Sequence, residues 1–215
     1  MTHEELQQLA GQLSQPSGTY GLTVSEMMHE TNISMTKHAI ASLQLCPHEH
    51  ILELGHGNAA HLPYLLEQAA GLVYSGLELS ELMHTEAKRI NDTLLHRADF
   101  TLYDGIIFPF PENFFDKVFT VNTIYFWQQP LDTLNECYRV MKPGGRLCIT
   151  FGEASFMQQL PFTQFGFTLY SSDTVTALAG NTPFTITGIE SQKELIKSKT
   201  GESIERTYST ITLSK

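Results

Sequence analysis

Hydrophobic positions near the start of the chain recur every three or four residues, the spacing that places side chains on one face of an α-helix. Leu6, Leu9 and Leu13 follow this spacing and predict an amphipathic helix over residues 2–14. The segment Gln15-Pro16-Ser17-Gly18 then ends the helix, because proline and glycine favour turns. The chain is therefore expected to begin with one short helix followed by a turn.

A second helix is predicted over residues 24–45, where apolar and polar positions are mixed. It ends before Cys46-Pro47, because a residue that precedes proline disfavours the α region. Together the two helices predict an N-terminal helical cap over residues 1–47. Two interpretations of the second helix can hold together: it packs on the main domain, and it forms a lid over a substrate pocket.

From residue 48 onwards, short apolar segments alternate with glycine turns and amphipathic segments, which predicts a parallel sheet with right-handed crossovers. The predicted strands are residues 50–54, 72–78, 94–102, 117–122 and 145–151, and the predicted helices are residues 59–70, 80–91 and 131–141. The remainder predicts a short helix at 173–179 and neighbouring antiparallel strands at 184–191 and 203–213. We expect residues 48–215 to form an α/β domain, three-layered and doubly wound, with a seven-stranded, mostly parallel sheet that ends in an antiparallel C-terminal strand.

The balance of charge argues against a nucleic-acid partner. The chain has 13 basic and 23 acidic residues, which give a formal net charge of −10. A nucleic-acid-binding protein needs a basic surface to neutralise phosphates, and no run of lysine and arginine supplies one. The richest stretch, Lys193–Lys199, also contains Glu194 and is expected to be a solvated face.

Hydropathy, cysteines and histidines narrow the class further. No run of eighteen apolar residues is present and the first ten residues are polar and acidic, so we expect neither a membrane-spanning helix nor a signal peptide. Cys46, Cys137 and Cys148 are an odd number without a CxxC spacing, which is typical of reduced thiols. The nine histidines form no zinc signature, so no metal is expected. We expect a cytoplasmic protein.

One predicted strand runs directly into a glycine turn, within Ile51–Ala60 (ILELGHGNAA). Glycines allow a tight turn and let a ligand approach the backbone, and N–H groups at the start of a helix suit an anionic group. Gly55-x-Gly57-x-x-Ala60 also fits the dinucleotide-binding fingerprint. Glu78 follows 21 positions after Gly57, at the end of the next strand, where a carboxylate accepts hydrogen bonds from ribose hydroxyls.

These residues predict a ribose-containing cofactor across the carboxyl ends of the first two strands. By themselves they allow either a nicotinamide dinucleotide or S-adenosylmethionine. Glu53 lies just before Gly55, where its carboxylate would repel a pyrophosphate and attract the amino group and sulfonium of S-adenosylmethionine. The charge at this position therefore favours S-adenosylmethionine.

Residues 104–116 (DGIIFPFPENFFD) resemble the class I S-adenosylmethionine-dependent methyltransferases, particularly the large branch that acts on small molecules. In that family an acidic residue after the third strand precedes a Pro-Phe-Pro loop and a Phe-Asp pair that leads the fourth strand. Residues 139–147 (RVMKPGGRL) match the family's helix, Lys-Pro-Gly-Gly turn and fifth strand. The resemblance covers residues 48–152, and it departs at Ala59, where the family usually has glycine.

The resemblance implies roles for individual residues. Asp104 would accept from the adenine amino group, and the Gly105 N–H would reach a ring nitrogen. His56 would line the methionine end of the cofactor without acting as a base, and Asn122 would face the methionine moiety. The expected cofactor-binding residues are Glu53, Gly55, His56, Gly57, Asn58, Glu78, Leu79, Asp104, Gly105 and Asn122.

Methyl transfer is an in-line displacement that depends on holding the acceptor close to the methyl group, and it needs a base only if the acceptor loses a proton. The expected acceptor-facing residues are Tyr20, residues 29–35 and residues 122–127, with His29 as the candidate base and Tyr125 as a further substrate-facing residue. Aromatic side chains at such spacings are also typical of a core. If they line the pocket, the acceptor is partly apolar or aromatic.

Two other functions are compatible with parts of the sequence. A dinucleotide-dependent oxidoreductase is supported by the Gly55 and Gly57 spacing and disfavoured by Glu53 and Asp104. A non-enzymatic module would bind S-adenosylmethionine without an acceptor. The sequence specifies neither the methylated atom nor the oligomeric state.

Overall fold

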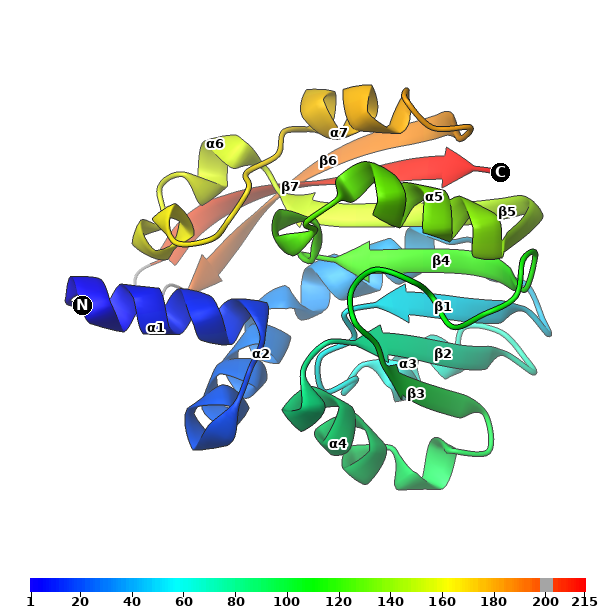
Figure 1. Ribbon diagram of the computed structural model, residues 1–215, viewed down its shortest axis with the longest axis horizontal. Coiled ribbons are helices and arrows are strands. Elements are labelled where there is room, and N and C mark those ends of the chain that lie inside the picture. Colours follow the sequence, from blue (N-terminus) through cyan, green and yellow to red (C-terminus); the bar gives the residue numbers. More distant parts are fainter. Residues whose placement is uncertain (198–202) are drawn as a thin grey trace.

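The computed structural model describes residues 1–197 and 203–215 of the chain (Figure 1). Its strands are β1 (His50–Leu54), β2 (Val73–Glu78), β3 (Ala98–Leu102), β4 (Phe115–Val121), β5 (Met141–Gly152), β6 (Thr185–Lys197) and β7 (Ser203–Ser214). Its α-helices are α1 (His3–Ser14), α2 (Gly18–Ser42), α3 (Leu62–Leu66), α4 (Glu81–Ile90), α5 (Pro130–Val140), α6 (Ala154–Met157) and α7 (Ser172–Ala179). Short 3₁₀ turns lie at Asp92–Leu94, Ile124–Phe126 and Pro161–Gln164.

The seven strands form one sheet in the order β3-β2-β1-β4-β5-β7-β6. The pairs from β3 through to β5 are parallel, whereas β7 is antiparallel to both of its neighbours. This confirms the predicted mostly parallel sheet with its antiparallel C-terminal strand. The chain adds strands on one side of β1 and then returns to place β4 on the other side. Such a reversal creates a crevice at the carboxyl ends of the two central strands.

Helices cover both faces of the sheet, as the predicted three layers require. Ile51 and Leu52 are adjacent in β1, fully buried, and point to opposite faces because side chains alternate along a strand. Leu52 packs in a cluster with residues of α5 and α7, and Ile51 packs in a second cluster with residues of α2 and α3. Figure 1 shows α5 and α7 in front of the sheet and α2 and α3 behind it. Burial of each such side chain stabilises the fold by about 1.5–3 kcal/mol.

The second helix of the cap differs from its predicted bounds. It begins at Gly18 after the N-cap residue Ser17, six positions before the predicted start. No proline follows within the helix, so nothing prevents this earlier start. It ends at Ser42, and Gln44 then adopts a positive φ of 53° ahead of Pro47. The end of α2 packs on the sheet, and Figure 1 shows α1 and the first turns of α2 beyond the carboxyl ends of β1 and β4. The division between a cap and a main domain at residue 47 stays a prediction.

The helix predicted at 59–70 is the largest error of the sequence analysis, because α3 has only five residues. Ala59 takes a positive φ of 50°, a left-handed conformation that L-residues adopt at a cost and that cannot continue a helix. Pro63 then lies in the first turn of α3, the position where proline is tolerated. The left-handed backbone at Ala59 also gives a physical reason for a glycine preference at this position.

The other boundary errors are smaller, and β4, predicted at 117–122, begins two residues earlier, at Phe115. β3 begins at Ala98 because the preceding residues form a 3₁₀ turn, and β6 extends to Lys197 beyond the predicted end at 191. Of the basic stretch, Lys193 is exposed and pairs with Glu205, whereas residues 198 and 199 lie outside the described residues. Among residues 1–197 and 203–215, no helix is long and apolar enough to cross a membrane. Within the same ranges no three acidic, histidine or cysteine side chains gather in a way that could hold a metal ion.

Candidate functional site

A hollow of about 210 Å³ lies at the carboxyl ends of β1, β2 and β4. All ten residues that the sequence analysis assigned to the cofactor line this hollow, although they come from four separate segments of the chain. They are Glu53, Gly55, His56, Gly57, Asn58, Glu78, Leu79, Asp104, Gly105 and Asn122. The crevice created by the strand order therefore brings the predicted residues to one place.

Glu53, the penultimate residue of β1, is a buried carboxylate with two partners from other segments. Its Oε2 accepts a hydrogen bond of 2.5 Å from the Tyr74 hydroxyl and lies 2.8 Å from Nε2 of His61. Burial and the neighbouring Glu53 charge raise the pKa of Tyr74 well above its ordinary value, so Tyr74 stays a donor. Both contacts use Oε2, so Oε1 of Glu53 is left for another donor.

Glu78 ends β2 and holds the glycine turn. Its Oε2 accepts from the backbone N–H of Gly57 at 2.9 Å, and its Oε1 accepts from those of Leu79 at 2.8 Å and Ser80 at 3.0 Å. Burial raises the pKa of Glu78, and the three hydrogen bonds oppose that effect. The expected anion site at a helix start is wrong here, because α3 begins only at Leu62 and the Gly57 N–H already has a carboxylate partner.

His56 stands between the two glycines and is 4% exposed. Its Nδ1 lies 2.7 Å from the carbonyl oxygen of Gly57, so Nδ1 carries the proton and Nε2 is the acceptor. Burial lowers the pKa of His56 to about 4, which leaves the ring neutral at pH 7. Nε2 is one of two fully buried side-chain polar atoms without a partner in the described residues. The ring packs on Phe100, with 5.0 Å between ring centroids.

Asp104 lies on the exposed rim of the hollow, where it forms a turn. Its Oδ1 accepts from the backbone N–H groups of Ile106 at 2.9 Å and Ile107 at 3.2 Å, and these bonds lower the pKa of Asp104. Gly105 follows with a φ of 84°, a conformation that glycine adopts without strain. The turn thus uses Oδ1 of Asp104, and Oδ2 takes no part in these two hydrogen bonds.

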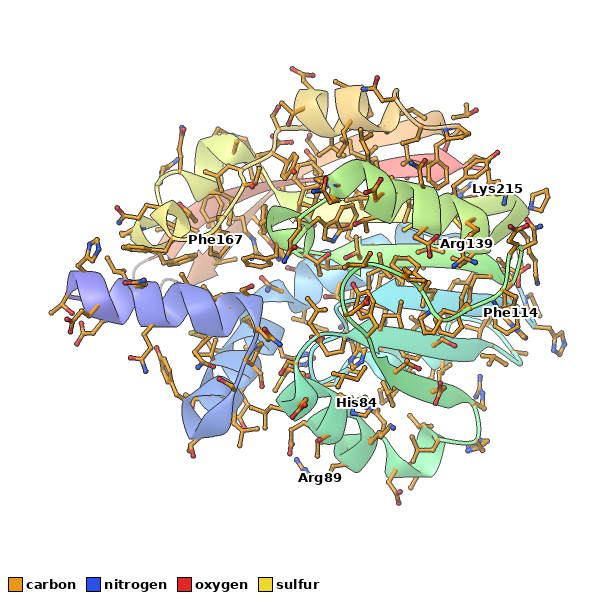
Figure 2. The ribbon with its side chains drawn as sticks, viewed as in Figure 1. His84, Arg89, Phe114, Arg139, Phe167 and Lys215 are labelled. Atoms are coloured by element: carbon orange, nitrogen blue, oxygen red, sulfur yellow. The ribbon has the colours of Figure 1, made fainter. Side chains whose placement is uncertain are left out.

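The loop that carries Asp104 is held from α5 by Arg139, which is labelled in Figure 2. Arg139 donates to the carbonyl oxygens of Phe108 at 2.9 Å and Phe110 at 2.8 Å, and it pairs with Glu136 at 2.7 Å. Glu136 in turn accepts from the Phe108 N–H at 3.0 Å. The backbone around the Pro-Phe-Pro segment is therefore anchored to α5 through two carbonyl oxygens and one N–H group.

Of the three side chains predicted individually to face the acceptor, which are Tyr20, His29 and Tyr125, two do not line the hollow. Tyr20 lies in the first turns of α2 with 39% of its surface exposed, away from the lining residues. Tyr125 is buried, and its hydroxyl donates to Oδ1 of Asn122 at 3.0 Å, so it holds Asn122 instead of facing an acceptor. His29 does line the hollow, and burial, followed by the nearby His61, lowers the pKa of His29.

The sequence analysis missed part of the cover that α2 forms over the hollow. Within the predicted stretch 29–35, only His29 and Asn32 line it. Further lining positions lie before and after that stretch on the same face of the helix, at the i, i+3, i+4 and i+7 spacing that begins at Ser25. These are Ser25, Met28 and Thr36. Phe126 and Trp127 also line the hollow, from the segment after β4.

The reversed strand order defines a Rossmann-like α/β protein, and the carboxylate-lined hollow lies at the crevice where proteins of this fold bind their ligands. A family model for a methyltransferase domain matches residues 52–149. Over 127 residues the chain is 29% identical to the uncharacterized methyltransferase YdaC of Bacillus subtilis, which covers 58% of this chain and 67% of that protein. Over 132 residues it is 30% identical to the ubiquinone/menaquinone biosynthesis C-methyltransferase UbiE of Cereibacter sphaeroides, which covers 60% of this chain and 51% of that protein.

Among solved structures, a SAM-dependent methyltransferase from Aquifex aeolicus has a TM-score of 0.70 at 17% identity, covering 90% of this chain and 98% of that chain. At this identity the likeness shows the fold. The chain spans about two thirds of the length of YdaC and about half of the length of UbiE. The family match, the relatives and the fold together support a class I S-adenosylmethionine-dependent methyltransferase.

Proposed function

We propose that the protein transfers a methyl group from S-adenosylmethionine to a small-molecule acceptor. The observation that carries this proposal is the charge of the hollow, whose lining includes Glu53, Glu78 and Asp104 and neither lysine nor arginine. Opposite charges attract strongly where water is scarce, and like charges repel. A cationic sulfonium and amino group suit such a lining, whereas the pyrophosphate of a nicotinamide dinucleotide does not.

The residues also fit the shape of this cofactor. A Cβ built on Gly57 would meet nothing within 4 Å, so the turn leaves open space beside the backbone. Glu78 would accept from the ribose hydroxyls, Asp104 and Gly105 would hold the adenine, and Oε1 of Glu53 would accept from the amino group. When bound, S-adenosylmethionine supplies a methyl carbon that its sulfonium activates for displacement.

On the acceptor side, the chain positions the substrate and excludes water. Met28 of α2 and the aromatic pair Phe126 and Trp127 supply apolar surface, which supports an acceptor that is partly apolar or aromatic. His29 is the residue we assign to proton removal, for an acceptor that must lose a proton. Its lowered pKa keeps the ring neutral at pH 7, so a nitrogen lone pair is available.

We also propose that the protein acts in the cytoplasm. Cys46, Cys137 and Cys148 are all free in the structure, which supports a reducing compartment. The absence of lysine and arginine from the lining supports a small molecule, not a nucleic acid, as the acceptor.

Calorimetry and an enzymatic assay on the full chain test this function. We expect S-adenosylhomocysteine to bind in titration calorimetry and NADH not to bind. Methyl-labelled S-adenosylmethionine would then be incubated with a panel of small aromatic and apolar compounds, and labelled products identified by mass spectrometry. Binding of NADH without S-adenosylhomocysteine would refute the cofactor assignment. Binding of S-adenosylhomocysteine with no labelled product across the panel would indicate a binding module instead of an enzyme.

A further inference from the structure

A buried arginine from the C-terminal part of the chain reaches the cover of the hollow. Arg206 in β7 is 5% exposed, and its Nη1 donates to Oδ1 of Asn32 in α2 at 2.9 Å. Its Nη2 donates to the backbone carbonyl oxygen of Thr31 at 2.7 Å. These contacts join residues that are about 175 positions apart. They tie the middle of α2 to the β6–β7 pair.

The guanidinium group of Arg206 is itself held in place. Its Nε donates to Oε1 of Glu194 in β6 at 2.9 Å, and its Nη2 lies 2.5 Å from the same oxygen. Two charge-assisted hydrogen bonds to one oxygen, together with the bonds to α2, restrict the position and the plane of the guanidinium group. Asn32 therefore meets a donor whose direction is set by the sheet.

This contact decides which end of the Asn32 amide is left for another partner. A guanidinium carries only donors, so the partner that meets it must be the carbonyl oxygen of the amide. The other end of the side chain is then the NH₂ group, which can only donate. In the described residues, the fully buried side-chain polar atoms without a hydrogen-bond partner are His38 Nε2 and His56 Nε2, so Nδ2 of Asn32 is not sealed in the interior without a partner. Asn32 lines the hollow, which gives Nδ2 a place to donate.

We propose that Asn32 selects the methyl acceptor by donating a hydrogen bond from Nδ2 to an uncharged carbonyl-type oxygen, and that Arg206 is the positioning residue that orients this amide. The inference rests on the proposed methyl transfer and adds the chemical class of the acceptor. Phe126 and Trp127 line the same hollow and suit an aromatic or apolar body. An uncharged oxygen fits better than a carboxylate, because the lining contains carboxylates and no lysine or arginine.

Three probes of similar shape test whether binding in the hollow depends on a carbonyl oxygen or only on an apolar body. Acetophenone carries a carbonyl oxygen, 1-phenylethylamine carries an ammonium group and ethylbenzene carries neither. With the protein saturated by S-adenosylhomocysteine, ligand-observed NMR titration is expected to show acetophenone binding at least five-fold more tightly than the other two. Absence of acetophenone binding at millimolar concentration, or equal binding of the three probes, would overturn the proposal.

Asn32→Asp is the decisive variant. Aspartate keeps the size of the side chain and the oxygen that meets Arg206, so the fold should be retained, but it has no N–H to donate. We expect the preference for acetophenone to disappear while the affinity for S-adenosylhomocysteine changes by less than about three-fold. Asn135→Asp, at an exposed position on α5, makes the same charge change away from the hollow and should leave the preference unchanged. Retention of the preference in Asn32→Asp would overturn the proposal.

Two variants of Arg206 test the positioning role. Arg206→Lys keeps a donor toward Oδ1 of Asn32 and should retain most of the preference, whereas Arg206→Met removes the donor and should abolish it. If Arg206→Lys and Arg206→Met show the same preference for acetophenone over the other probes, the positioning role of Arg206 is overturned. Failure of the proposed function is recognised separately, because it would appear as an absence of S-adenosylhomocysteine binding before any probe is added.

Discussion

The backbone N–H of Gly57 donates to Oε2 of Glu78 at 2.9 Å, across 21 residues of chain. The glycine turn after β1 and the carboxylate at the end of β2 are therefore one hydrogen-bonded unit. Glu78 has two functions in this arrangement, because the same carboxylate that faces the proposed ribose position also holds the turn. A substitution at Glu78 is consequently expected to affect both stability and cofactor binding.

Glu78→Ala should lower the free energy of unfolding by about 2–4 kcal/mol, since it leaves three backbone N–H groups without their acceptor in a buried place. Glu78→Gln keeps one oxygen acceptor, so its loss should be smaller. Both variants should bind S-adenosylhomocysteine about ten-fold or more weakly. Urea unfolding and titration calorimetry measure the two effects. Glu81→Ala, exposed in the first turn of α4, is the matched control and should change neither.

Asp104→Asn separates the turn from the ligand contact. Asparagine keeps an Oδ1 acceptor for the N–H groups of Ile106 and Ile107, but its NH₂ group cannot accept a hydrogen bond from an adenine amino group. We expect about a ten-fold loss of S-adenosylhomocysteine affinity with an unchanged melting temperature, and Asp104→Ala should weaken binding at least as much. Wild-type affinity in both variants would exclude the assigned role of Asp104.

Gly55→Ala and Gly57→Ala form a matched pair, because both glycines have a positive φ, of 70° and 57°. A Cβ at Gly55 would stand 2.4 Å from Cγ2 of Thr123, whereas a Cβ at Gly57 would meet nothing within 4 Å. Thr123 cannot easily move, since its hydroxyl accepts from Trp127 Nε1 at 3.1 Å. Gly55→Ala should therefore be destabilised by about 1–3 kcal/mol more than Gly57→Ala in urea unfolding. Equal stability of the two variants would contradict the close approach of Thr123.

His56 should make the stability depend on pH. Burial lowers its pKa to about 4 from an ordinary 6.5, with Glu53 opposing this shift and His61 and His84 adding to it. Between these two pH values the unfolded chain binds more protons at His56 than the folded protein, so stability rises with pH through this window and is lost as the pH falls.

The expected contribution of His56 is a loss of roughly 2 kcal/mol between pH 7 and pH 5. Urea unfolding of the wild type and of His56→Gln at a series of pH values isolates this contribution, because the other titrating groups are common to both proteins. The variant should show a shallower loss on acidification. Parallel curves for the two proteins would show that His56 is not held neutral by burial.

The sequence predicted the central strands well, because their signal is local. β1 was predicted at its observed bounds and the other parallel strands within a few residues, since short apolar runs between glycine and proline turns are typical of buried strands. The prediction failed at residues 59–70, where a single left-handed residue, Ala59, prevents the helix that the composition favours. Whether a non-glycine residue takes a left-handed backbone depends on its tertiary contacts, which the local pattern of hydrophobic and polar residues does not show.

The sequence by itself determined which residues gather at the hollow, because the carboxyl ends of neighbouring parallel strands lie together in such a sheet. Only the tertiary structure decided what those residues contact. It paired Glu53 with Tyr74 and His61, removed Tyr125 from the hollow, and brought Arg206 to Asn32. These are contacts between side chains distant in sequence, and their geometry follows from the packing of whole elements, not from the periodicity of any one of them.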